Sequence, residues 1–238
     1  MNIHSQAPSA ENISWLRDRV NGIHQRNRQQ GSASWCGHSY DFTCPSHETY
    51  PFQWFWDSCF HAIALSHIDI NKAEAELFSL LKNQHADGFI SHVTFWQRDV
   101  YEEMVSTYDI AFRTKYLSDE MQPPLLAEAV NAVAQRGRGQ DFLREILPGV
   151  IRFYEWCHAV RSPYNNGLIR VIQPDETGLD HSPKWDELMK IKDEEHSSFE
   201  RGWKLICDQS QAACDRSYHR VSPRDCSHFP GSPRDSPD

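Results

Sequence analysis

Apolar residues recur at helical spacing in several segments, and the most apolar segment covers residues 50–67. Within it, residues 55–65 contain no Gly or Pro. Apolar side chains fall at positions i, i+3, i+4 and i+7, which are Trp56, Cys59, Phe60 and Ile63. Other apolar residues occupy the opposite side, so no polar face remains. A helix that is apolar all round is predicted to be buried on all sides.

The same periodicity predicts helices before and after this segment. Ser9 is expected to cap a first helix that ends near Gln30, and Asp69 is expected to cap a helix that ends near Gln84. The first helix has Ile13, Leu16, Val20 and Ile23 on one side, and the second has an inner stripe of Ala73, Leu77, Leu80 and Leu81.

Further along the chain, two more helices are predicted. One follows Pro123 and Pro124, which a first helical turn tolerates, and runs to about Gly137. The other covers about 140–160, and Pro148 is expected to bend it. Their inward stripes are Leu126, Ala129, Val130 and Val133, then Phe142, Ile146, Val150, Phe153 and Cys157. A weaker pattern predicts a helix for residues 102–118.

Long irregular connections alternate with the helices, chiefly residues 31–50 and 85–101, which are rich in aromatic residues and His. Long loops of this kind in a compact domain are more often functional than idle. Five or six helices, few strands and elaborate loops on one face indicate an all-α fold of the toroid type.

Composition narrows the class of protein. The chain has 238 residues, enough for one domain with a sizeable core or for two small domains. Its net charge of −9 disfavours a nucleic-acid partner. No long apolar run or signal-peptide core occurs, and the seven cysteines are odd in number without a C-x-x-C motif. We therefore expect a soluble cytoplasmic protein with no membrane partner.

The character of the sequence changes near Cys207. Residues 215–238 contain the tetrapeptide SPRD twice, four prolines and almost no aliphatic residues. Such a segment buries too little apolar surface to offset its ordering entropy. Residues 206–238 are therefore predicted to form a disordered tail outside a domain of residues 1–205.

Two stretches contain candidate functional residues. Gln53, Trp54 and Asp57 stand at the start of the apolar helix, where flat aromatic faces beside an amide and a carboxylate would suit a sugar ring. Alternatively the aromatics are core residues and Asp57 is a helix cap. Glu176 and Asp180 precede a second helix start at Ser182, whereas Asp180 could also be a turn residue.

A third constellation suggests a metal site. Cys36, His38, Cys44 and His47 fall within twelve residues and could ligate zinc. Their spacing is not that of a common zinc finger, so this stays an alternative.

The two stretches, taken in order, resemble the mannosylglycerate-hydrolase-like branch of glycoside hydrolase family 63. The resemblance covers roughly residues 10–205. The matching segments are Tyr50 with 53–58, the His85–His92 segment with its Asp87-Gly88, Gln122-Pro123-Pro124, and 176–186.

The resemblance implies the first half of an (α/α)6 toroid and inverting hydrolysis of a small α-glycoside, such as mannosyl- or glucosylglycerate, without cofactor or metal. Asp180 matches the family's general acid. The other matched positions imply substrate binding by Tyr50, Gln53, Trp54, Trp56, Asp57, His92, Gln122 and Trp185.

Inverting hydrolysis also needs a carboxylate base. The resemblance implies a base in the second half of the toroid, beyond residue 205, and only three residues separate Glu176 from Asp180 in the loop. We therefore expect a truncated chain with weak or no activity. The alternative is a non-catalytic sugar-binding fragment, in which uncovered helix faces favour self-association.

Overall fold

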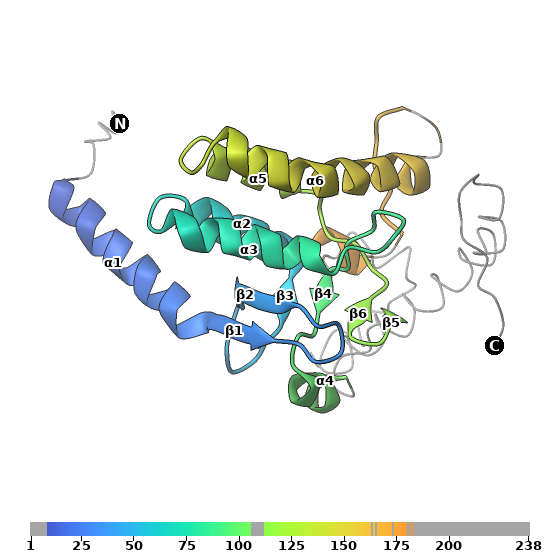
Figure 1. Ribbon diagram of the computed structural model, residues 1–238, viewed down its shortest axis with the longest axis horizontal. Helices are drawn as coiled ribbons and strands as arrows, with labels where there is room; N and C mark the ends of the chain where they lie inside the picture. Colours follow the sequence, from blue (N-terminus) through green and yellow to red (C-terminus); the bar gives the residue numbers. More distant parts are fainter. Residues whose placement is uncertain are drawn as a thin grey trace. The chain divides into compact units, whose positions relative to one another are not determined.

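The computed structural model describes residues 9–105, 112–162, 164, 166–172, 174–179 and 182. They belong to two units, Met1–Arg170 and Val171–Asp238. The described part of the first unit contains six α-helices and six short strands (Figure 1). No helix among the described residues is both long and apolar enough to cross a membrane.

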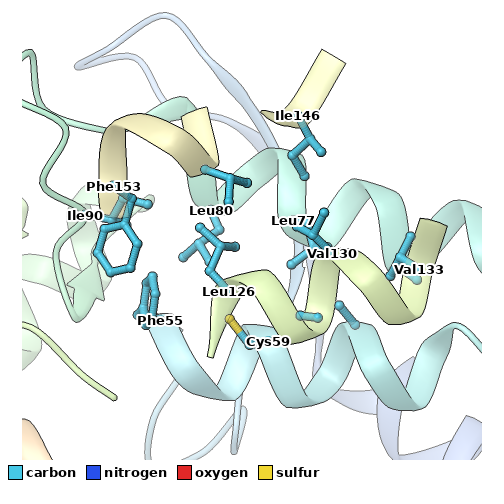
Figure 2. Close-up of a cluster of buried hydrophobic side chains, with 14 of the residues drawn as sticks. Phe55, Cys59, Leu77, Leu80, Ile90, Leu126, Val130, Val133, Ile146 and Phe153 are labelled. Atoms are coloured by element: carbon cyan, nitrogen blue, oxygen red, sulfur yellow. The ribbon is translucent and has the colours of Figure 1, made fainter. Parts of the chain in front are cut away.

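Four helices form the main core of the first unit: α2 (Phe55–Leu65), α3 (Ile70–Lys82), α5 (Leu126–Ala134) and α6 (Gln140–Arg161). The neighbours α2 and α3 pack side by side, and α5 and α6 form a second pair against them (Figure 1). Figure 2 shows side chains from all four helices meeting in one apolar cluster, in which the labelled members are Phe55, Cys59, Leu77, Leu80, Ile90, Leu126, Val130, Val133, Ile146 and Phe153.

Local sequence signals explain where several helices begin. The Ser9 side chain accepts a hydrogen bond from the backbone N–H of Asn12 (3.1 Å) at the start of α1 (Ala10–Asn27). Asp69 accepts one from the N–H of Lys72 (3.3 Å) at the start of α3. Both predicted caps are therefore confirmed. Such caps can be recognised in a sequence because an N-cap oxygen bonds an N–H only two or three residues away.

The strands form two small antiparallel sheets. In the first, β1 (Arg28–Ser32) pairs with β2 (Ser39–Thr43). The second has the order β3-β4-β6-β5, in which β3 is Gln53–Trp54, β4 Val93–Thr94, β6 Leu117–Ser118 and β5 Phe112–Thr114. A short helix, α4 (Arg98–Met104), separates β4 from β5. The pairing of Trp54 with Val93 brings the start of α2 beside the loop that follows α3.

The strands correct parts of the sequence-based expectation. The first helix ends at Asn27 rather than near Gln30, because the chain continues as β1. Residues 39–43 are a strand within the predicted loop. The helix predicted for 102–118 is wrong at its described ends, since α4 stops at Met104 and residues 112–118 form β5 and β6. Helices still dominate the described residues, and the inner stripes of α3, α5 and α6 lie against the main core as expected.

The expectation that α2 is buried on all sides is wrong. Phe60 on α2 is 51% exposed, because α3 and α5 cover only the opposite side of the helix among the described residues. The apolar stripe of α1 is also exposed at Ile13, Leu16 and Ile23, and the buried residues of α1 are His24 and Asn27. The proline in α6, Pro148, lies within one continuous helix of 22 residues.

The loop between α3 and β4 packs closely on α6 through a glycine. Gly88 has a φ of 99°, a left-handed conformation that side chains rarely adopt. A Cβ at this position would also collide with the backbone carbonyl of Arg152. The Asp87 carboxylate accepts a hydrogen bond from the N–H of Phe89 (3.1 Å) and completes the turn. This turn sets the path of the chain towards His92.

In the second unit, the described residues include a 3-10 helix, Pro174–Thr177. Glu176 is buried there, and its carboxylate accepts a hydrogen bond from the N–H of Ile172 (2.7 Å). Asp180, Trp185 and the predicted tail 206–238 lie outside the described residues.

Ile146 and Ile151 on α6 offer a matched test of the main core. Ile146 is 1% exposed and Ile151 is 52% exposed. Ile146→Ala should lower the free energy of unfolding by about 2–5 kcal/mol, because it removes buried carbon atoms and leaves a cavity. Ile151→Ala should change it by less than about 0.5 kcal/mol. Urea unfolding followed by circular dichroism measures both, and equal losses would contradict an open face on α6.

Candidate functional site

The candidate site forms around the amino terminus of α2. A helix start leaves backbone N–H groups without partners inside the helix. Trp54, the N-cap residue, has no side-chain hydrogen bond to cap them. Instead the N–H of Phe55 donates to the His92 carbonyl (2.8 Å), and the N–H of Trp56 donates to Gln122 Oε1 (2.9 Å). The segments around His92 and Gln122 are therefore hydrogen-bonded to the first turn of α2.

Aromatic rings gather on one side of this helix start. The Trp54 ring meets Tyr50 edge to face at 5.9 Å between centroids and lies 5.5 Å from Phe52. Its third neighbour is the His92 ring at 5.4 Å. Tyr50 is exposed and Trp54 partly so, whereas Phe52 is buried. The cluster thus has a packed inner side and an accessible outer side of flat, apolar ring surface.

Asp57 supplies a partly buried carboxyl group to the first turn of α2. Desolvation by burial raises its pKa from 3.8 to about 6, while a hydrogen bond from its own backbone N–H works in the opposite direction. The Asp57 carboxyl can therefore exchange a proton near neutral pH. It also remains within reach of solvent beside Trp56, which is partly exposed.

His92 is held in a neutral form behind the Trp54 ring. Burial lowers the pKa of His92 to about 3, against a hydrogen bond to the backbone of Glu120 that raises it. Its Nδ1 lies 2.8 Å from Ser118 Oγ, and its Nε2 lies 3.3 Å from Glu120 Oε2. The neutral tautomer that fits both contacts donates from Nε2 to Glu120 and accepts at Nδ1 from Ser118. His92 therefore supports the aromatic cluster from the inside.

Gln53 is also engaged in the interior. It is 1% exposed, and its Oε1 accepts a hydrogen bond from Trp96 Nε1 (2.8 Å). Its Nε2 donates to Ser58 Oγ (3.0 Å). The predicted site residues that the structure describes thus separate into two groups. Those that reach the surface are Tyr50, Trp54, Trp56 and Asp57, and those that lie beneath it are Gln53, His92 and Gln122.

Four buried polar residues that support the site were not singled out from the sequence: Ser58, Glu76, Ser118 and Glu120. Glu76 could have been found, because it occupies an inward position of the α3 stripe between Ala73 and Leu80. A carboxylate at a position that helical periodicity assigns to the core is a signal of a buried polar network. Nothing local marks Ser118 or Glu120.

The zinc hypothesis does not hold. Within the described residues, no three of the His, Cys, Asp and Glu side chains form a group that could hold a metal ion. Cys44 is buried, and its thiol instead donates to the carbonyl of Asn27 (3.1 Å). Cys36 lies near the carbonyl of Ala33, and the His47 side chain is largely exposed.

Known proteins are similar to this chain in both sequence and fold. A mannosylglycerate hydrolase from Thermus thermophilus is 32% identical over 168 residues, which is 67% of this chain and 40% of that enzyme. A glucosylglycerate hydrolase from Mycolicibacterium hassiacum is 29% identical over 189 residues, 72% of this chain and 42% of that enzyme. The chain thus spans less than half the length of both.

A solved structure gives the same picture. A family 63 mannosylglycerate hydrolase from Thermus thermophilus, in complex with Tris and D-glycerate, matches with a TM-score of 0.65 and 26% sequence identity. The match covers 90% of this chain and 53% of that one. The family model of the mannosylglycerate hydrolase MGH1-like glycoside hydrolase domain matches residues 50–228, well over half of the sequence. The chain therefore belongs to the mannosylglycerate hydrolase MGH1-like glycoside hydrolase family.

Proposed function

We propose that this chain forms the sugar-binding end of an inverting glycosidase that acts on small α-glycosides of glycerate. The observation that supports this most is the convergence of Tyr50, Trp54, Trp56 and Asp57 at the start of α2, with Gln122 bonded beneath them. Aromatic faces bind the apolar faces of sugar rings, and a carboxylate accepts hydrogen bonds from their hydroxyl groups. The names of the relatives, mannosylglycerate and glucosylglycerate hydrolases, indicate the substrate class.

Hydrolysis with inversion requires a protonated acid at the leaving oxygen and a base that activates water on the opposite face. Asp180 takes the role of the acid in this proposal, with Trp185 as a wall of the pocket. The matching base is proposed to belong to a second half of the toroid, which would correspond to the part of the relatives that this chain does not match. The helices α2, α3, α5 and α6 are proposed to belong to the first half of that toroid.

The 238-residue polypeptide is accordingly proposed to bind glycosides and to hydrolyse them weakly or not at all. The second candidate is a binding fragment that also associates through uncovered helices. The exposed Phe60 on α2 and the exposed stripe of α1 favour this second possibility. Turnover above background would favour the first candidate, whereas self-association without turnover would favour the second.

A hydrolysis assay tests the catalytic part. Release of glycerate from mannosylglycerate and glucosylglycerate by the purified chain should stay near background, because loss of one acid–base group costs about two to four orders of magnitude. Asp180→Asn should therefore change almost nothing. Robust turnover that Asp180→Asn abolishes would show that a base lies within these residues, with Glu176 the first to be examined.

A binding experiment tests the sugar site independently of catalysis. Calorimetric titration with mannosylglycerate and glucosylglycerate should give saturable binding, and Trp54→Ala should weaken it at least about tenfold because the ring face is lost. Trp15→Ala is the control, since Trp15 is exposed on α1. Absence of binding to a folded chain, or an equal loss in both variants, would contradict the proposed site.

The pH dependence of stability tests whether Asp57 is a helix cap or a ligand-binding group. Its pKa is about 6 in the folded chain and 3.8 ordinarily, so the folded state retains a proton that the unfolded state releases. Asp57 should thus cost stability increasingly as the pH rises from about 4 to above 6. Asp57→Asn should raise the free energy of unfolding at pH 8 by up to about 3 kcal/mol and leave it unchanged below pH 4.

Urea unfolding over this pH range measures the effect. Asp141→Asn is the control, since Asp141 occupies the first turn of α6 and is exposed. The control should show no rise in stability at pH 8. Destabilisation by Asp57→Asn at pH 8 would favour a helix cap over a ligand group.

A further inference from the structure

A buried chain of hydrogen bonds runs from the second sheet to α3 beneath the candidate site. Trp96 Nε1 donates to Gln53 Oε1 (2.8 Å), and Gln53 Nε2 donates to Ser58 Oγ (3.0 Å). Ser58 Oγ then donates to Glu76 Oε1 (2.6 Å). The other oxygen of Glu76 accepts from the backbone N–H of Thr43 (2.7 Å). Ser58 is fully buried, and Gln53, Glu76 and Trp96 are each 1% exposed.

The donor-to-acceptor direction of these hydrogen bonds is fixed at Trp96. An indole N–H can only donate, so the Gln53 carbonyl must face Trp96 and its NH2 group must face Ser58. Ser58 then accepts from Gln53 and can give its own proton to a carboxylate. The two oxygens of Glu76 complete the chain because they accept from both Ser58 and Thr43. With Glu76 ionised, each group has one orientation that satisfies its neighbours.

The chain of hydrogen bonds adjoins two of the surface residues of the site. Gln53 directly precedes Trp54 in β3, and Ser58 directly follows Asp57 in α2. Alternation in the strand points Gln53 inward and Trp54 outward. Ser58 and Asp57 are successive residues of the first helical turn, and Ser58 is the buried one. The orientation of Trp54 and Asp57 is therefore set from beneath by the residues next to them.

We propose that Glu76 is a positioning residue: through Ser58 and Gln53 it fixes the first turn of α2, and with it the sugar-facing Trp54 and Asp57. The consequence for glycoside affinity rests on the proposed function, whereas the mechanical role does not. The carboxylate of Glu76 is hydrogen-bonded to Ser58 and Thr43, so its influence on the surface residues passes through these neighbours.

A purely structural role for Glu76 is the alternative, and Ser79 shows what such a role looks like. Ser79 lies on the same helix and accepts a hydrogen bond from the N–H of Asp41 (2.8 Å), as Glu76 does from that of Thr43. Both thereby satisfy the edge of β2 that does not pair with β1. The Ser79 hydroxyl also donates back to the carbonyl of Asp41, whereas Glu76 has a second oxygen bonded to α2. Ser79 is thus a matched control.

The protonation state of Glu76 does not alter which groups are joined. Burial raises the pKa of Glu76 to about 8, with the hydrogen bonds from Ser58 and Thr43 lowering it and Asp41 raising it. In the protonated acid, Oε2 still accepts from Thr43, and the proton on Oε1 donates to Ser58. A glutamine would make the same two contacts through its carbonyl and its NH2 group. Glu76→Gln should therefore preserve the positioning, whereas Glu76→Leu should remove it.

The experiment measures backbone hydrogen exchange by mass spectrometry on the full chain. Glu76→Leu should speed exchange in residues 53–58 about tenfold or more, because the Ser58 hydroxyl that anchors the first turn of α2 loses its acceptor, and the Thr43 N–H loses one too. Glu76→Gln should restore protection of 53–58 to within about threefold of the parent chain. Ser79→Ala should speed exchange in residues 39–43 and leave 53–58 unchanged. Ser58→Ala removes the hydroxyl that joins Gln53 to Glu76 and replaces Ser58 with a small residue that favours helix. It should therefore speed exchange in residues 53–58 as Glu76→Leu does, and it provides the test if Glu76→Leu fails to fold.

Glycoside titration adds the functional measurement. Glu76→Leu and Ser58→Ala should weaken binding about five- to tenfold, and Glu76→Gln and Ser79→Ala should not. Unchanged exchange at 53–58 in Ser58→Ala would overturn the proposal, as would equal loosening of 53–58 by Ser79→Ala. If the parent chain binds no glycoside, the proposed function fails, and the exchange results still decide the role of Glu76.

Discussion

The candidate site depends on satisfying the backbone N–H groups at the partly buried start of α2. Unpartnered N–H groups away from water cost free energy comparable to a lost hydrogen bond. Trp54 offers no capping oxygen, so the carbonyl of His92 and the side chain of Gln122 supply the acceptors. These two bonds bring segments together that are far apart in the sequence. The same contacts that complete the helix therefore also assemble the candidate site.

The surface and the interior of the candidate site consist of different kinds of residue. Tyr50, Trp54, Trp56 and Asp57 present ring faces and a carboxyl group at the surface. Beneath them, buried polar side chains have their hydrogen-bonding groups occupied by one another, as at His92 and Gln53. A site is precise when a layer of packed and bonded residues locks the rotamers of the groups that meet the ligand. The raised pKa of Asp57 shows that burial disfavours its ionised form. Keeping this partly desolvated carboxyl group at the candidate site therefore costs stability above its ordinary pKa.

Much of the helical framework could be predicted from the sequence because its signals are local. The caps at Ser9 and Asp69 bond N–H groups three residues away, and α2 has the predicted bounds, Phe55–Leu65. The stripes of α3, α5 and α6 pack into the main core because helical periodicity places apolar residues on one face. The resemblance of Tyr50 with 53–58, of 85–92 and of 122–124 to one enzyme family likewise indicated which segments would meet at α2.

Only the tertiary structure decided which of those side chains face outward. Strands β3, β4 and β6 have two residues each, too few to give a recognisable alternation of apolar and polar residues in the sequence. They exist because distant segments pair. The burial of Gln53 and His92 depends on partners such as Trp96 and Glu120, which no spacing rule identifies. The exposure of Phe60 could not be predicted either, because apolar periodicity defines a helix's faces but not which of them a neighbouring element will cover.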